Sequence, residues 1–166
     1  DIVLPLRTLE DAIALAGSLF EIWPILVYPS RIYDHGAAAR QGQFRQPRKQ
    51  DLVPGTNYAM YYDLGVYGIP AQIMQGGAAR ANFKPVTAMR QMEAFTRKNR
   101  GAPFLYANTF MDRDEFGEMF DLALYEKVRA KYGADEHFHH LFDKTSGCQS
   151  YDFQDMLDEE SKKKKV

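Results

Sequence analysis

The chain has 166 residues, of which 45% are hydrophobic and 13% aromatic, and its formal net charge at pH 7 is -1. This length and composition predict one globular domain with a buried core, and the balanced charge argues against nucleic acid as a partner. The single cysteine, Cys148, excludes an internal disulfide, and no apolar run approaches the roughly 18 residues that a membrane-spanning helix needs.

The first half of the chain predicts three strands and a helix. A strand pattern covers residues 1–6, and apolar residues at helical spacing over 8–20 predict an amphipathic helix. The apolar run 22–28 and the aromatic run 58–68 predict two more strands. Between these runs, residues 29–57 contain three prolines and three glycines without periodicity, and we expect a long loop of the kind that binds ligands or forms a lid.

A second helix and a fourth strand follow a glycine-rich connection. Pro85 suits the first turn of a helix, and apolar residues at helical spacing come after it. We expect this helix to end before Gly101, at the place where a left-handed C-terminal residue belongs. The run 104–110 then predicts the last strand.

A third long helix is predicted from Asp112 to Gly133. Asp112 and Glu115 have the spacing of a capping box, and Gly133 marks the end of the helix. The side chains expected to face the core are Phe116, Met119, Phe120, Ala123, Leu124 and Val128.

The order of these elements predicts the fold class. Strand, helix and strand occur twice, and the trailing helix follows them. Two such halves indicate an α+β fold, a ferredoxin-like antiparallel sheet with helices on one face. We expect this domain to cover residues 1–143, and we expect residues 144–166, with their blocks of like charge, to form a flexible C-terminal tail.

The predicted strands have an apolar face and an aromatic face, because side chains alternate along a strand. An aromatic surface with a few polar groups suits a pocket for a mainly hydrophobic ligand. Tyrosine is also favoured on strands simply because it fits a half-buried surface, whereas an aspartate in mid-strand is unusual. The aromatic face would carry Tyr61, Asp63, Tyr67, Tyr106, Asn108 and Phe110.

Several short motifs occur in order along the chain: YYDLGVYG at 61–68, MRQME at 89–93, LYA at 105–107, EMFD at 118–121, LY at 124–125 and KYG at 131–133. Together they resemble the C-terminal part of the delta-24 sterol reductases. This family includes 24-dehydrocholesterol reductase and its plant Diminuto-type relatives, within the vanillyl-alcohol-oxidase superfamily of FAD enzymes.

The resemblance implies a cap domain that closes over the flavin and forms most of the substrate cavity. The FAD-binding domain of the same polypeptide would lie upstream of Asp1. The implied reaction reduces the delta-24 double bond of a sterol side chain, with NADPH supplying the hydride through FAD. The implied partners are the sterol and the FAD domain, with membrane association through the N-terminal part at the cytosolic face of the endoplasmic reticulum, and self-association through the aromatic face.

The reaction implied by the resemblance needs a proton donor beside the alkene, and a tyrosine in an apolar site keeps its proton. Tyr106 is the first candidate for this catalytic role and Tyr61 is the second. The other residues expected to face the substrate or the flavin are Asp63, Tyr67, Asn108, Tyr28 and Phe110.

Two alternatives remain open. The chain could be a stand-alone module that binds a hydrophobic ligand or a protein, or the cap of a related FAD-dependent oxidase. It departs from the family pattern at Gly117, at Leu122-Ala123 and near Tyr28, and residues 34–57 are peculiar to it, which leaves another lipid-like alkene open as substrate.

Two weaker motifs complete the sequence analysis. Arg40, Arg45, Arg48 and Lys49 could meet the phosphates of NADPH or an anionic bilayer, or simply keep a loop in water. The histidines of EHFHH, residues 136–140, do not complete a recognisable metal site, and we predict no metal there.

Overall fold

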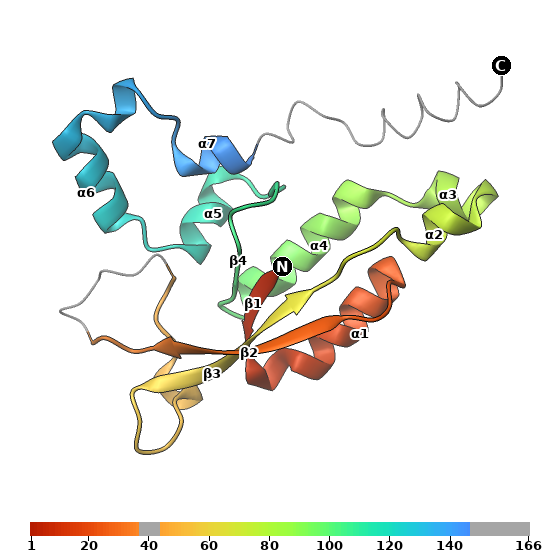
Figure 1. Ribbon diagram of the computed structural model, residues 1–166, viewed down its shortest axis with the longest axis horizontal. Coiled ribbons are helices and arrows are strands. Elements are labelled where there is room, and N and C mark those ends of the chain that lie inside the picture. Colours follow the sequence, from red (N-terminus) through yellow and green to blue (C-terminus); the bar gives the residue numbers. More distant parts are fainter. Residues whose placement is uncertain (37–43, 147–166) are drawn as a thin grey trace.

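The computed structural model describes residues 1–36 and 44–146. In this part of the chain, one sheet contains β1 (Ile2–Pro5), β2 (Leu26–Tyr33), β3 (Tyr58–Gly65) and β4 (Ala102–Pro103). The strand order is β2-β3-β1-β4, and each neighbouring pair is antiparallel (Figure 1). With helices between β1 and β2 and between β3 and β4, this is the split βαβ arrangement of ferredoxin-like folds, and the predicted α+β class is confirmed.

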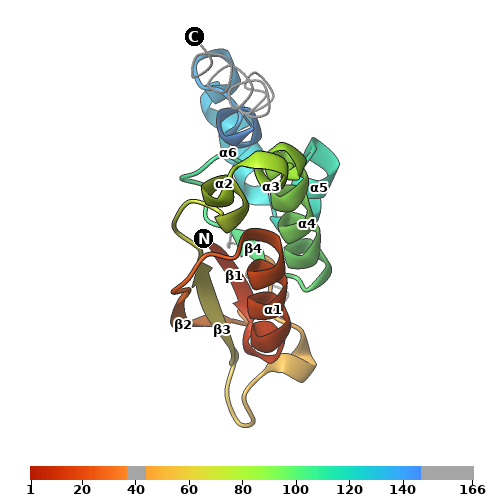
Figure 2. The same cartoon turned by 90° about the vertical axis from the view of Figure 1, so that its right-hand side faces the viewer.

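Two helices cover one face of the sheet, α1 (Leu9–Phe20) and α4 (Pro85–Lys98), as Figure 2 shows. Leu4 and Leu64 point from the strands into the core between the sheet and these helices. Both helices were predicted from their apolar spacing, and both are confirmed. The shorter elements on this side are η1 (Leu6–Thr8), α2 (Ala71–Gln75) and α3 (Gly77–Asn82). Among the described residues, no helix is long and apolar enough to cross a bilayer.

The second strand lies later than predicted. The sequence indicated 22–28, but β2 begins at Leu26, two residues after Pro24, and continues to Tyr33. Proline has no backbone N–H to give to a strand ladder, so the apolar residues before it do not pair. The predicted loop 29–57 is therefore shorter at its start, and its described residues include one 3-10 turn, η2 (Lys49–Asp51).

The strand predicted over 104–110 is wrong, because β4 lies before that run. β4 covers Ala102–Pro103, and after the hydrogen bond from Phe104 N–H to the Asp1 carbonyl the chain turns away from the sheet. The N–H of Phe110 donates to the Glu93 carboxylate at 2.7 Å, and that of Thr109 donates to the Thr145 carbonyl. These donors are not available to a neighbouring strand, so the alternation over 104–110 was misleading.

The predicted third helix is divided in two, α5 (Arg113–Met119) and α6 (Ala123–Tyr132). The capping box of Asp112 and Glu115 is confirmed, and so is the left-handed stop at Gly133. The break occurs because Phe120 is extended and forms a β-bridge with Phe44. Phe116, Met119 and Phe120 are buried, but the prediction was wrong for the exposed Ala123, Leu124 and Val128.

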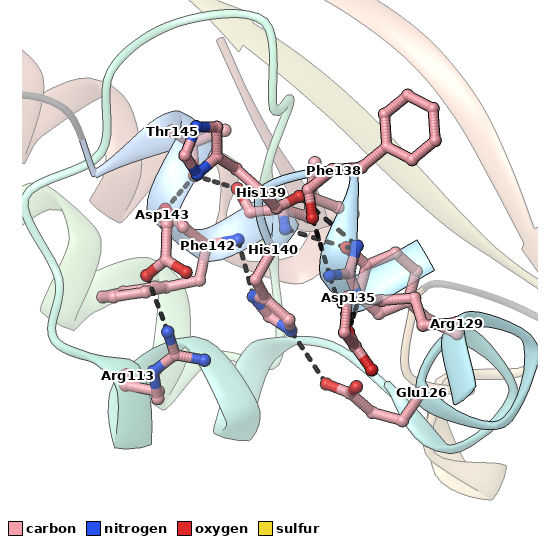
Figure 3. Close-up of polar contacts among 12 residues, drawn as sticks. Arg113, Glu126, Arg129, Asp135, Phe138, His139, His140, Phe142, Asp143 and Thr145 are labelled. Carbon is pink, nitrogen blue, oxygen red and sulfur yellow. Dashed lines mark hydrogen bonds and ion pairs between the residues drawn. The ribbon is translucent and has the colours of Figure 1, made fainter. Parts of the chain in front are cut away.

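The EHFHH motif is part of the packing that joins α6 to the end of the described chain. The buried Arg129 donates to Asp135 at 2.7 Å and to the carbonyl of Phe138 at 2.8 Å (Figure 3). His140 Nε2 lies 2.8 Å from Glu126 Oε1, and its Nδ1 accepts the N–H of Phe142. No cluster of three metal-ligating side chains occurs within 1–36 and 44–146.

Two short elements complete the C-terminal region, η3 (Ala134–Glu136) and α7 (Leu141–Thr145). Helix α7 crosses the predicted boundary between the domain at 1–143 and the tail at 144–166. The rest of that predicted tail lies outside the described residues.

Gly101 has a different role from the one predicted. The left-handed residue after α4 is Arg100, with φ of 59°, whereas Gly101 lies where β4 passes close to β1. A Cβ on Gly101 would lie 2.4 Å from the Val3 carbonyl oxygen and 2.7 Å from Leu4 Cδ2. The glycine is therefore required because the two backbones approach each other.

We expect Gly101→Ala to lower the free energy of unfolding by about 1–3 kcal/mol, the usual cost of overpacking. The control is Gly117→Ala, because a Cβ on Gly117 meets nothing within 4 Å. Alanine is the better helix former by up to about 1 kcal/mol, so this control should be neutral or stabilising. Urea denaturation of both variants measures the difference, and equal effects would contradict the close approach of β1 and β4.

Candidate functional site

The sheet face away from α1 and α4 has a covered half and an open half. In the covered half, Tyr61 packs with Val3 and Ala59 beneath Ile32 and Leu52. The open half is the end near Asp1, and its side chains are those of Asp1, Leu26, Tyr28, Asp63 and Tyr67 together with Gly65.

The strand register brings the residues of the open half together. Tyr28 on β2 is directly opposite Asp63 on β3, and Leu26 is opposite Gly65. A Cβ on Gly65 would lie 2.6 Å from the Tyr67 ring, so the absence of a side chain there lets that ring lie across the strand. The Tyr67 hydroxyl donates a hydrogen bond to the Asp1 carboxylate, and this bond raises the pKa of Tyr67 to about 12.

Asp63 is the most unusual residue of the open half. Its Oδ1 is buried and has no hydrogen-bond partner among the described residues, and the same holds for the Oγ of Ser30. Burial raises the pKa of Asp63, and the nearby carboxylate of Asp1 raises it further. A buried acceptor without a partner is costly, so Asp63 Oδ1 could accept a hydrogen bond from a ligand that donates one.

The stacked rings of Phe104 and Tyr106, which follow the backbone bond to Asp1 at this end of the sheet, are called the rim of the open half. The Tyr106 side chain is 69% exposed, and its ring stacks on Phe104 with 6.3 Å between the centroids. Because the N–H of Phe104 bonds to the carbonyl of Asp1, this stack is at the same end of the sheet as Tyr67. The segment 104–112 is not a strand, so residue parity does not decide where Tyr106 points.

The remaining predicted site residues lie elsewhere. Tyr61 is only 3% exposed, and burial raises its pKa, with a further contribution from Asp51. Asn108 is exposed two residues beyond Tyr106, and Phe110 is half-buried. The structure thus brings Tyr28, Asp63 and Tyr67 together on the open half. Tyr61 lies on the same face but is covered by Ile32 and Leu52. Tyr106, Asn108 and Phe110 follow on the segment that leaves the sheet beside Asp1.

Glu93 on α4 was missed at the level of sequence. Its side chain is 7% exposed, Oε1 accepts the N–H of Phe110, and Oε2 is buried without a partner in the described part of the chain. Burial raises the pKa of Glu93 to about 7, although the Phe110 N–H and Arg90 oppose the shift. The signal was present, because Glu93 follows Met89 by four residues and therefore lies on a largely apolar side of the helix.

Two cavities occur away from the open half. One, of about 240 Å³, lies on the helix side and is lined mainly by apolar residues such as Ile22, Leu64 and Met89. The other, of about 490 Å³, lies between Arg45, Arg100 and the α5–α6 junction. The guanidinium of Arg45 donates to the carbonyl of Gly117, so this member of the basic loop has a structural contact.

The Delta(24)-sterol reductase of Homo sapiens is 32% identical over 146 residues, which are 87% of this chain and 24% of that protein. The Delta(24)-sterol reductase of Pisum sativum is 30% identical over 137 residues, 81% of this chain and 23% of that protein. A Delta(24)-sterol reductase homolog of Caenorhabditis elegans is 29% identical over 144 residues. The chain is a homologue of the Delta(24)-sterol reductases.

The chain spans about a quarter of the length of the Delta(24)-sterol reductases that it matches. No family model matches it. No solved structure matches it either. The resemblance predicted from the short motifs between Tyr61 and Gly133 is confirmed by these relatives.

Replacing Asp63 tests whether its carboxylate is kept at a cost to stability. The raised pKa of Asp63 in the folded state means that folding disfavours its ionised form. The stability that the protonated Asp63 gives is therefore complete below its ordinary pKa of 3.8 and is lost as the pH rises through the folded-state pKa. We therefore expect Asp63→Asn to raise the free energy of unfolding at pH 7. The gain should disappear below about pH 3.8, where both states are protonated.

The control for this prediction is Asp51→Asn, because Asp51 pairs with Arg7 at 3.1 Å. Removing a partnered carboxylate should lower stability at pH 7 or leave it unchanged. Denaturation of the three proteins between pH 3 and pH 8 measures both effects. A loss of stability in Asp63→Asn at pH 7 would mean that Asp63 has a stabilising role in the fold.

Proposed function

We propose that the chain is the C-terminal, substrate-binding cap of an FAD-dependent sterol reductase that reduces a delta-24 side-chain double bond. The observation that carries the proposal is the buried, unpartnered Oδ1 of Asp63 among the rings of Tyr28 and Tyr67. The homology to Delta(24)-sterol reductases supports the assignment. The domain would extend over residues 1–143.

The open half has the properties of a surface that meets a flat or largely apolar ligand. Tyr28, Tyr67 and Leu26 offer exposed apolar area, and Asp63 offers a buried oxygen that needs a hydrogen-bond partner. Binding pockets typically combine a mainly apolar lining with a few polar groups that fix orientation. These residues fit the flavin edge and the sterol side chain, while the main contacts of FAD would come from a domain outside this chain.

FAD, when bound, would pass the hydride of NADPH to one carbon of the sterol double bond. The other carbon must receive a proton, and a phenol keeps its proton at neutral pH until it is needed. Tyr106 is the first candidate because its hydroxyl is accessible at the rim of the open half. The O–H bond breaks as the new C–H bond forms, and the exposed phenolate then recovers a proton from water.

Tyr61 is the second candidate. Its buried phenol also stays neutral, but Leu52 and Ile32 cover it, so a substrate reaches it only if the loop that carries Leu52 moves. Asn108 and Phe110 follow Tyr106 on the same segment and would contribute to the same wall.

Two other functions use the same surface. A stand-alone module would bind a hydrophobic ligand or a protein through the exposed rings of Tyr28, Tyr67 and Tyr106. A related FAD-dependent oxidase would keep the flavin but take electrons from its substrate. NADPH and substrate, offered separately as reductants of the flavin, distinguish a reductase from an oxidase.

The proposal extends to the location of the enzyme. A sterol reductase that contains this cap would act at the cytosolic face of the endoplasmic reticulum membrane. It would be a monomer or a homo-oligomer.

The natural protein tests the proposal. We expect an intact mass above the 19.0 kDa of this chain, a flavin absorption spectrum, and conversion of a delta-24-unsaturated sterol to its saturated product in the presence of NADPH. A colourless protein of 19.0 kDa would contradict the reductase and favour the binding module.

Tyr106→Phe tests the proton donor in the natural protein. Loss of general-acid catalysis should lower the turnover number about 100-fold or more, while the rate of flavin reduction by NADPH should not change. The matched control is Tyr132→Phe on α6, because Tyr132 is also exposed, at 70%. Stopped-flow spectroscopy and product analysis measure the two steps, and undiminished turnover in Tyr106→Phe would exclude Tyr106 as the donor.

A further inference from the structure

The segment 104–112 carries Tyr106 and Asn108 but belongs to no strand. After Phe104, backbone groups of the segment form hydrogen bonds with side chains of α4 and α5 and with the carbonyl of Thr145. Side chains therefore determine how this segment lies on the rest of the domain.

Two residues of α4 bind the backbone N–H and the backbone carbonyl of Phe110. The Glu93 carboxylate accepts its N–H at 2.7 Å, and the Arg90 guanidinium donates to its carbonyl oxygen. Arg90 also pairs with Glu115 at 3.0 Å, and Glu115 in turn caps Asp112 at the end of the segment. We call these contacts of Arg90, Glu93 and Glu115 the clamp; it extends from α4 through the segment to the start of α5.

Burial makes Glu93 the central member of the clamp. The side chain is 7% exposed and has no ion-pair partner at salt-bridge distance among the described residues, whereas Arg90 and Glu115 satisfy each other. A buried carboxylate that is kept in a helix without such a partner is expensive, which favours a specific role over packing.

We propose that Glu93 is a positioning residue that fixes the segment 104–112, and with it the Tyr106 hydroxyl, at the rim of the open half. The inference rests on the function proposed above for Tyr106. Glu93 does not touch the reacting atoms and acts through the backbone of Phe110.

The charge state of Glu93 affects this clamp at physiological pH, because its pKa is raised to about 7. The ionised carboxylate is the stronger acceptor for the Phe110 N–H. The charged groups that face Glu93 are Arg90 and Arg97 from its own helix and Glu115 from α5. The two arginines favour the ionised form and Glu115 opposes it. Because the ionised form accepts the Phe110 N–H more strongly, the hydrogen bond to Phe110 strengthens as the pH rises through about 7.

The experiment uses the natural full-length protein with Glu93→Ala, Glu93→Gln and the control Glu136→Gln. Glu136 is exposed in η3 and is not a member of the ion pairs that join Arg90, Arg97 and Glu115, so its replacement leaves the clamp intact. Hydrogen–deuterium exchange of a peptide covering 104–112 is compared with that of α1 between pH 6 and pH 8. Flavin reduction by NADPH and its reoxidation by a delta-24 sterol are then timed separately.

We expect Glu93→Ala to accelerate exchange in 104–112 about tenfold or more, the loss corresponding to one charge-assisted hydrogen bond, with α1 unchanged. Reoxidation by the sterol should slow while reduction by NADPH does not. Glu93→Gln keeps a neutral acceptor, so it should restore part of the protection and remove the change of exchange and reoxidation near pH 7. If Glu93→Ala does not fold, the pH dependence of Glu93→Gln decides the question alone.

Unchanged exchange in Glu93→Ala would overturn the proposal, and so would faster exchange with unchanged sterol reoxidation. If the unmodified protein is not reoxidised by any delta-24 sterol, the proposed function fails by itself. The exchange comparison then still decides whether Glu93 holds the segment.

Discussion

The pairing of β1 with both β3 and β4 is the constraint on which the rest of the structure depends. Val3 of this short central strand is opposite Asp63 on one side and Ala102 on the other. A shift of one residue would turn Leu64 outward and Asp63 into the helical core, because side chains alternate between faces. Gly101 protects this register by allowing the two backbones to approach closely.

The two edges of the sheet serve the site in different ways. On one edge, β2 supplies a regular strand that sets Tyr28 opposite Asp63. On the other edge, β4 ends after two residues, and the chain continues as a segment held by side chains such as Glu93. Segments held in this way can rearrange at less cost than strands, which suits a wall that must admit and release a ligand.

A carboxyl group with a raised pKa occurs both in the open half and behind the segment 104–112. Asp63 lies in the open half and Glu93 lies behind the rim, and burial is the first cause of the shift in each. Both residues lower the stability of the fold in their ionised forms at neutral pH. Their presence is best explained by the groups that they hold or are ready to hold.

The sequence was sufficient for α1 and α4 and for the faces of β3, but not for the break between α5 and α6 at Phe120. Apolar spacing located α1 and α4, and alternation correctly separated Leu64 from Asp63, because these elements are regular and half-buried. It failed for the run 104–110, where the same alternation occurs without a ladder. The helical spacing of Glu93 behind Met89 indicated that it is buried, but its bond to the backbone of Phe110 depends on a tertiary contact that no local pattern contains.

The central claim is that the open half of the sheet faces the substrate. Hydrogen–deuterium exchange of the natural protein, with and without a delta-24-unsaturated sterol, tests it most directly. The account predicts that the sterol protects peptides covering 26–33, 58–67 and 104–110, while the peptide covering α1 is unaffected. Protection confined to α1 and α4, or none at saturating sterol, would contradict it.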